Sequence, residues 1–133
     1  MDLMTTCAYI HLQETISLAD LHHTLIEYQQ KLARTGKQLS WPYEEAAFPY
    51  KIQMYHQYSD EWLLLKSTSP PRYRTLMIGV QEEPSGTSTI HVLLPSTASF
   101  GDKGKANELC RYLATLHQAK LTLFNGRVQS FQD

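Results

Sequence analysis

Apolar side chains recur three or four residues apart in two stretches of the chain, which predicts two amphipathic helices. The first begins at Ser17 and ends at Gly36, because glycine tolerates the backbone conformation that follows a helix end. The second starts near residues 101–104 and runs to about Gln118. The two apolar stripes are Leu18, Leu21, Leu25, Tyr28 and Leu32, and then Ala106, Leu109, Cys110, Leu113, Leu116 and His117.

Elsewhere apolar and polar residues alternate, which predicts strands. The expected strands span residues 5–12, 51–58, 62–66, 73–80, 89–94, 121–124 and 127–131. Turn residues separate several neighbouring strands, and Asn125-Gly126 is the strongest of these signals. Hairpins therefore dominate the chain order.

This order predicts an α+β fold, a two-layer sandwich of a mostly antiparallel sheet with two main helices on one face. The chain has 133 residues, which is the length of a single globular domain over residues 1–133. Each helix has one apolar stripe, so both helices can pack against the same face of the sheet. The other face of the sheet is then exposed to solvent, or it is buried against a partner.

Residues 37–50 follow neither pattern. Two aromatic–proline corners, Trp41-Pro42-Tyr43 and Phe48-Pro49-Tyr50, flank one short helical turn. Trp41, Tyr43, Phe48 and Tyr50 could line a groove for a peptide or a flat ligand, or they could close one end of the core as a lid. Glu44 and Glu45 lie between the two corners. One of them could act as a general acid, or both could place favourable negative charge in the first turn of the short helix.

A segment rich in glycine and lysine opens the second predicted helix. Gly101, Lys103, Gly104 and Lys105 could hold a small phosphate or carboxylate, because a helix N-terminus offers free N–H groups and partial positive charge. The spacing matches neither a Walker motif nor a dinucleotide fingerprint. The alternative is a turn in which Asp102 caps the helix and the lysines are solvated.

Composition and charge narrow the possible partners. Hydrophobic residues make up 42% of the chain and charged residues 19%, which is typical of a folded globular protein. The formal net charge is −1, so nucleic acid is an unlikely partner despite the basic and aromatic segment Arg72-Tyr73-Arg74. No apolar run has the length of a membrane span. We interpret Cys7 and Cys110 as free thiols, which are typical of the cytoplasm. The N-terminal residues do not resemble a signal peptide, which favours the same location.

Sequence motifs of catalysis and metal binding are missing. His22 and His23 are adjacent and point apart on a helix, whereas Cys110 and His117 would lie about 10.5 Å apart along the axis, too far for one zinc ion. Neither cysteine lies in a nucleophile motif. We therefore expect no metal, no cofactor and no catalytic residue, and we favour a protein that is not an enzyme.

Four stretches of the sequence carry a resemblance to known proteins, and this resemblance spans the chain from about Ser17 to Arg127. They are Gln38-Leu39-Ser40-Trp41, Ala46-Ala47-Phe48-Pro49-Tyr50, Phe100-Gly101-Asp102-Lys103-Gly104-Lys105-Ala106-Asn107-Glu108 and Leu123-Phe124-Asn125-Gly126-Arg127. Through them the sequence resembles a small family of single-domain proteins of unknown function from bacillus-type bacteria. The resemblance implies a fold similar to the half-repeat of the TATA-binding protein, a curved antiparallel sheet backed by helices. It implies no activity, no catalytic residue and no DNA binding.

Two functions follow from these observations. The first is a non-catalytic binding or protein-interaction domain that uses its uncovered sheet face or its aromatic segment, either with another protein or as a homodimer. Eight tyrosines in the chain suit such an interface. The second is a domain or enzyme that binds a small anionic ligand at residues 101–105, helped by Arg72, Arg74 or Arg127. Convergence of these cationic side chains in one pocket would favour the second.

Overall fold

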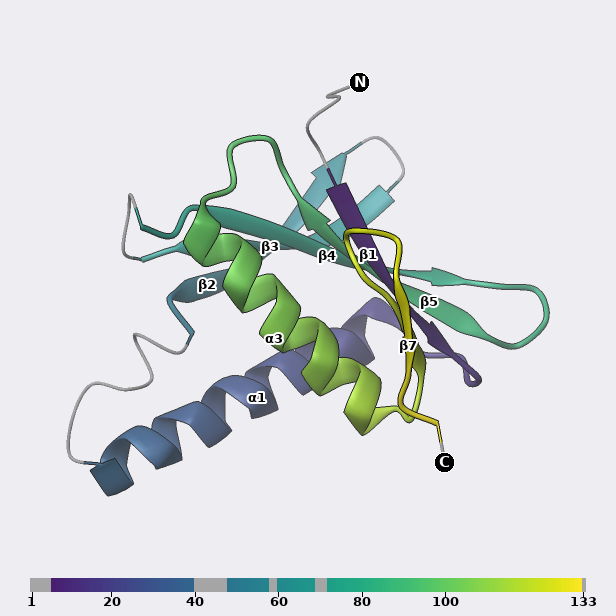
Figure 1. The fold of residues 1–133 in the computed structure, drawn as a ribbon, viewed down its shortest axis with the longest axis horizontal. Coiled ribbons are helices and arrows are strands. Elements are labelled where there is room, and N and C mark those ends of the chain that lie inside the picture. The colour runs from purple at the N-terminus through teal and green to yellow at the C-terminus, as the bar shows by residue number, and fades with distance from the viewer. Residues whose placement is uncertain (1–5, 40–47, 58–59, 69–71, 133) are drawn as a thin grey trace.

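The structure is a computed structural model that describes residues 6–39, 48–57, 60–68 and 72–132 (Figure 1). Within these residues the elements are β1 (Thr6–Leu12), α1 (Leu18–Leu39), β2 (Tyr50–Gln57), β3 (Asp60–Ser67), β4 (Thr75–Glu82), β5 (Ser88–Leu94), α3 (Phe100–Leu116), β6 (Lys120–Thr122) and β7 (Val128–Ser130). All neighbouring strands are antiparallel. This arrangement confirms the predicted α+β class with its antiparallel sheet.

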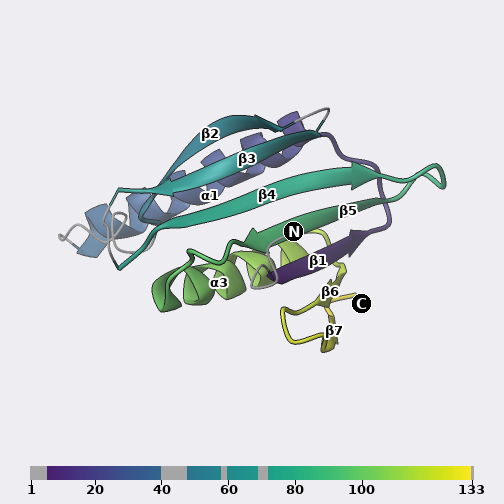
Figure 2. The ribbon, with the colours of Figure 1, turned by 90° about the horizontal axis from the view of Figure 1, so that it is seen from above.

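The seven strands form one sheet in the order β2-β3-β4-β5-β1-β6-β7. The strand nearest the N-terminus therefore lies inside the sheet, where Ile10 is opposite Ile90 on one side and Leu121 on the other. In Figure 2 the strands curve across the molecule, with α1 beside β2 and β3 and α3 beside β5 and β1. Hairpins connect β2 to β3, β4 to β5 and β6 to β7.

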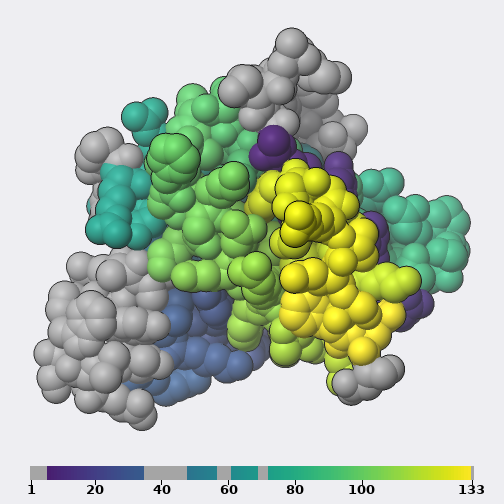
Figure 3. All heavy atoms as spheres, in the orientation of Figure 1, coloured from purple at the N-terminus to yellow at the C-terminus, as the bar shows by residue number. Residues whose placement is uncertain are grey.

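The core lies between the helices and one face of the sheet. Strand residues of one parity are buried there, as the alternation predicts. These are Ala8, Ile10, Leu12, Leu63, Leu65, Leu76, Ile78, Ile90, Val92 and Leu94. From the helices they meet Leu21, Leu25, Ala106, Leu109, Cys110 and Leu113. In the space-filling view, α3 and the C-terminal hairpin cover the middle of this side of the molecule (Figure 3).

The structure differs from the prediction in three details, and a fourth lies largely outside the described residues. Helix α1 continues through Gly36 to Leu39, so the predicted end at Gly36 is wrong; a glycine inside a helix costs only about 1 kcal/mol, which neighbouring turns can offset. Leu116, predicted on the apolar stripe, is 50% exposed in the last turn of α3.

The N-cap of α3 is Ser99, and Asp102 is the third residue of this helix and not its cap. The predicted short helical turn near residues 42–48 falls largely outside the described residues.

The sheet face opposite the core, which we call the open face, has no helix over it in the described part of the chain. Two neighbouring rows of partly exposed, mainly apolar side chains cross its centre. They are Leu64, Met77, Leu93 and Cys7 in one row, and Tyr55, Trp62, His91 and Tyr9 in the next. Polar residues such as Lys66 and Gln81 flank them. The open face is therefore an apolar strip with polar margins.

Candidate functional site

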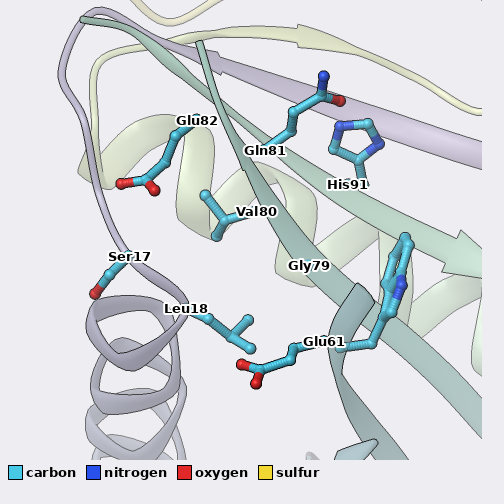
Figure 4. A pocket seen from close by; sticks show the side chains of 9 residues that line it. Ser17, Leu18, Glu61, Gly79, Val80, Gln81, Glu82 and His91 are labelled. Atoms are coloured by element: carbon cyan, nitrogen blue, oxygen red, sulfur yellow. The ribbon is translucent and has the colours of Figure 1, made fainter. Parts of the chain in front are cut away.

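Strand β3 leaves β4 partway along the sheet, and a notch opens between them. Among the described residues, β3 pairs with β4 only from Leu63 to Lys66, whereas β4 continues to Glu82 in register with β5. The notch has a volume of about 710 Å³ (Figure 4). Its lining residues are Ser17, Leu18, Glu61, Trp62, Gly79, Val80, Gln81, Glu82 and His91.

The notch has an acidic side that faces the start of α1. Figure 4 shows the carboxylates of Glu61 and Glu82 on the same side as Ser17 and Leu18, together with the side chain of Val80. Strand alternation agrees, because residues two apart along a strand share a face. This side of the notch therefore combines two carboxylates with a small apolar surface formed by Leu18 and Val80.

The other side of the notch belongs to the open face and is aromatic. The Trp62 ring lies over Gly79 so closely that a Cβ at Gly79 would be 2.9 Å from Trp62 Cε3. The His91 ring meets Trp62 edge to face, with centroids 6.4 Å apart, and meets Tyr9 in the same way at 5.0 Å. A glycine inside a strand often marks a close approach of this kind.

His91 is a neutral, partly unsatisfied group in this wall. Burial is the main cause that lowers the pKa of His91 below its ordinary value of 6.5, and it outweighs the opposing effect of Glu83. The buried Nε2 atom of His91 has no hydrogen-bond partner among the described residues. The neutral ring therefore predominates at pH 7, and the aromatic side of the notch carries no positive charge.

The lining of the notch is suited to a cation. Glu61 and Glu82 are its charged residues, and none of the nine lining residues is lysine or arginine. Glu61 Oε1 lies 3.6 Å from His56 Nδ1, a pair that is more than half exposed and that is ionic only when the histidine is protonated. A carboxylate without a permanent cationic partner attracts a lysine or arginine more strongly than one already paired.

A second polar cluster fixes the N-terminus of α3. Asp102 is fully buried, and its carboxylate accepts hydrogen bonds from the backbone N–H groups of Ser99 (2.9 Å), Arg74 (3.0 Å) and Thr75 (3.2 Å). The Tyr50 hydroxyl also donates to it. Burial, and then this hydrogen bond, raises the pKa of Tyr50. A carboxylate of the chain itself therefore ties α3 to the ends of β2 and β4.

The structure separates the predicted anion-binding residues. A Cβ at Gly101 would lie 2.6 Å from the Arg72 carbonyl oxygen, so Gly101 allows the helix to touch the chain before β4, whereas Gly104 has open space. Lys105 Nζ lies 3.4 Å from the Glu108 carboxylate. Lys103 lines a shallow hollow instead. We call this 490 Å³ feature the α3 hollow, and it is lined by Thr6, Arg74, Leu94, Pro95, Ser96, Thr97, Ala98, Ser99, Phe100 and Lys103.

Of the cationic side chains named as possible helpers, Arg74 is the one that joins Lys103 in the α3 hollow. Arg72 lies over the Tyr73 ring, 5.5 Å from its centroid, and Arg127 lies in the turn between β6 and β7. Binding of an anion at residues 101–105 stays a prediction.

The aromatic segment is described in part. Phe48 and Tyr50 are 7% and 2% exposed, and their rings pack edge to face with centroids 5.8 Å apart, so both belong to the core. Trp41 and Tyr43, like Glu44 and Glu45, lie outside the described residues. Ligand binding by this segment stays a prediction.

No group of three or more histidine, cysteine, aspartate or glutamate side chains converges in the described ranges as a metal site would require. Among the helices that the structure describes, none is long and apolar enough to cross a membrane.

Comparison with known proteins places the chain among relatives. A family model described as a domain of unknown function (DUF1885) matches residues 6–133. The chain belongs to this family. It is also similar to a solved structure titled "Crystal Structure of Protein of Unknown Function from Bacillus stearothermophilus", at 37% identity over 90% of this chain and 91% of that chain, with a TM-score of 0.61. No curated protein matches.

These findings confirm the predicted resemblance to a small bacterial family of unknown function. The likeness to a TATA-binding-protein half-repeat stays a prediction. The notch was not predicted from the sequence, although one signal for it exists. Gly79 interrupts an otherwise apolar and β-branched strand, which indicates that another group approaches its backbone.

Proposed function

We propose that the protein is a non-catalytic binding domain whose notch holds a lysine or arginine side chain of a partner protein. One observation carries the proposal: Glu61 and Glu82 lie on the same side of a notch whose lining contains no basic residue. The proposal needs no catalytic group, metal or cofactor. A cytoplasmic location, predicted from the free cysteines Cys7 and Cys110, forms part of it.

The size of the notch supports this proposal. Pockets for small ligands commonly measure about 300–1,000 Å³, and the notch lies within that range, so it has room for a side chain of a partner. Both carboxylates are exposed, and an exposed ion pair contributes at most about 1 kcal/mol, so a single basic group would bind weakly, with a Kd above about 1 mM. Salt would weaken this binding further, because the Debye length falls to about 8 Å at 0.15 M.

The test is an NMR titration of the full chain with N-acetyl-lysine methylamide. We expect amide shifts to centre on Gly79–Glu82 and the start of α1. N-acetyl-norleucine methylamide has nearly the same shape without the charge, and it should cause no saturable shift.

Matched variants locate the charge that binds. Glu61→Gln and Glu82→Gln should each weaken lysine binding by about threefold to tenfold. Glu108→Gln, which removes an exposed carboxylate on α3, should leave the affinity unchanged. Equal binding by all three variants, or equal binding of the norleucine compound, would contradict the proposal.

The α3 hollow supports a second candidate function, the binding of a small anionic ligand. The observation that favours it is the presence of Arg74 and Lys103 in one hollow with the hydroxyl residues Ser96 and Thr97. A thermal-shift screen with phosphate, sulfate and nucleotides tests it. A stabilising ligand should lose its effect in Lys103→Ala and keep it in Lys105→Ala, because Lys105 is paired with Glu108. A flat screen, or equal loss in both variants, would count against it.

A further inference from the structure

The notch exposes one edge of a strand as well as two carboxylates. Among the described residues, Ile78 is the last residue of β4 that pairs with β3, and β4 continues for four more residues to Glu82. On its other edge these residues remain in register with β5, from Gly79↔His91 to Glu82↔Ser88. A strand edge without a neighbour presents backbone N–H and C=O groups to an incoming chain.

The backbone pairing identifies which groups face the notch. Ser67 N donates to Arg74 O at 2.8 Å in the β3–β4 ladder, and residues that point toward one neighbour alternate along an antiparallel strand. Even-numbered residues of β4 therefore point their N–H and C=O groups toward β3. At the notch these residues are Val80 and Glu82.

The opposite edge of β4 gives the same assignment. Glu83 N donates to Thr87 O at 2.9 Å, directly beyond the last β4–β5 pair. Odd-numbered residues therefore point toward β5, which again leaves Val80 and Glu82 facing the notch. The N–H and C=O groups along a strand edge can pair with an incoming chain, so this edge suits a hydrogen-bonding partner.

We propose that the occupant of the notch is an extended segment of a partner protein that adds as a strand along Val80–Glu82, antiparallel to β4. This inference rests on the proposed function and names the form of the partner. The incoming residue opposite Val80 exchanges both backbone hydrogen bonds with it. Its side chain lies on the face that Val80 shares with Glu61 and Glu82 (Figure 4).

The two sides of the notch then specify the sequence of the segment. The residue opposite Val80 points to the acidic side, and lysine or arginine complements the two carboxylates there. Its two neighbours point to the open face, where Trp62 and His91 form an apolar wall. The segment is therefore extended, with one basic residue between two apolar or aromatic residues.

A blocked pentapeptide, serine-serine-valine-lysine-valine, tests this inference against the full chain, because with lysine opposite Val80 its last valine ends at Gly79 and does not reach Ile78, which pairs with Leu63. We expect it to bind at least about tenfold more tightly than N-acetyl-lysine methylamide, because the serine opposite Glu82 adds backbone hydrogen bonds and the valines contact the wall formed by Trp62 and His91. Hydrogen exchange of the Val80 and Glu82 amides should slow by about tenfold or more on binding.

Two N-methylated peptides provide the matched control. A methyl group on the lysine nitrogen removes the donor that faces Val80, and binding should fall by about tenfold. A methyl group on the nitrogen of the following valine lies on the outer edge, and affinity should be largely kept.

The outcomes separate the two proposals. If the pentapeptide binds no more tightly than the single blocked lysine, or both methylated peptides bind equally, strand addition is overturned while the proposed function stands. If the amides of Val80 and Glu82 exchange at the same rate with and without saturating peptide, strand addition is likewise overturned. If neither the blocked lysine nor the peptide binds, both proposals fall.

Discussion

The Tyr50 hydroxyl donates a hydrogen bond to the buried carboxylate of Asp102, which joins the first residue of β2 to the first turn of α3. The same carboxylate completes the capping box of α3 with Ser99 and accepts N–H groups at the start of β4. One side chain therefore satisfies donors from three separate parts of the chain. Its removal leaves several of them without a partner at once.

Asp102→Ala should lower the free energy of unfolding by about 3 kcal/mol or more, because it removes a helix cap and leaves buried donors unsatisfied. Tyr50→Phe should cost less, about 1–2 kcal/mol, since it removes one hydrogen bond and keeps the ring packed. Urea denaturation measures both. Asp20→Ala is the control, because Asp20 makes the corresponding capping box with Ser17 on the exposed start of α1. Equal losses for Asp102→Ala and Asp20→Ala would contradict this account.

The two glycines in the first turns of α3 should respond in opposite directions to alanine. Gly101→Ala places a methyl group 2.6 Å from the Arg72 carbonyl oxygen and 2.7 Å from a Tyr73 ring carbon, and it should destabilise the fold by about 1–3 kcal/mol. Gly104→Ala meets no neighbouring atom and should stabilise the fold by about 0.5–1 kcal/mol. Thermal unfolding of the two variants is the measurement, and a change of the same sign in both would refute it.

His91 should make stability depend on pH on the acid side of neutrality. Its pKa is lowered in the folded protein, chiefly by burial, so as pH falls below 6.5 the unfolded chain takes up a proton that the folded protein does not. The free energy of unfolding should therefore decrease from pH 6.5 downward until the folded pKa of His91 is reached. His91→Gln should flatten that part of the profile, and His23→Gln, at an exposed position on α1, is the comparison. A profile unchanged by His91→Gln would show that another group is responsible.

The two cysteines should differ in reactivity. Burial is the main cause that raises the pKa of Cys110 to about 12, and burial also raises the pKa of Cys7. Because the thiolate is the reactive form, a thiol reagent at pH 8 should label Cys7 slowly and Cys110 only as the protein unfolds. Cys7→Ser and Cys110→Ser identify the two rates, and both thiols should react at once in urea. Rapid labelling of Cys110 in the native protein would contradict its buried position.

The sequence predicted those parts of the fold that depend on neighbours along the chain. The start of the first helix at Ser17, the stripe through Leu21 and Leu25, and the turn at Asn125-Gly126 all follow from local spacing, and the structure confirms them. Hydrophobic periodicity is a property of a single helix or strand, so it can be recognised without knowing how the other elements pack.

The candidate site was largely beyond sequence analysis because it depends on contacts between distant segments. Asp102 was expected near a helix start, yet its bonds to Tyr50 and Arg74 come from residues brought together by the sheet. The notch exists because β3 turns away from β4 on the N-terminal side of Leu63. No local sequence pattern shows where the pairing of two strands ends. Strand order is equally nonlocal, and periodicity alone cannot place β1 between β5 and β6.

The interior position of β1 has a consequence for how the protein is made. This strand is synthesised before the other strands of the sheet, yet both of its neighbours, β5 and β6, follow it by about 75 residues or more. Its apolar residues Ala8, Ile10 and Leu12 therefore stay unpaired throughout translation of the segment that separates them from β5. Pairings so distant in sequence also form slowly. Until β5 has been synthesised, β1 is thus an aggregation-prone strand, which makes it a segment on which a chaperone would act.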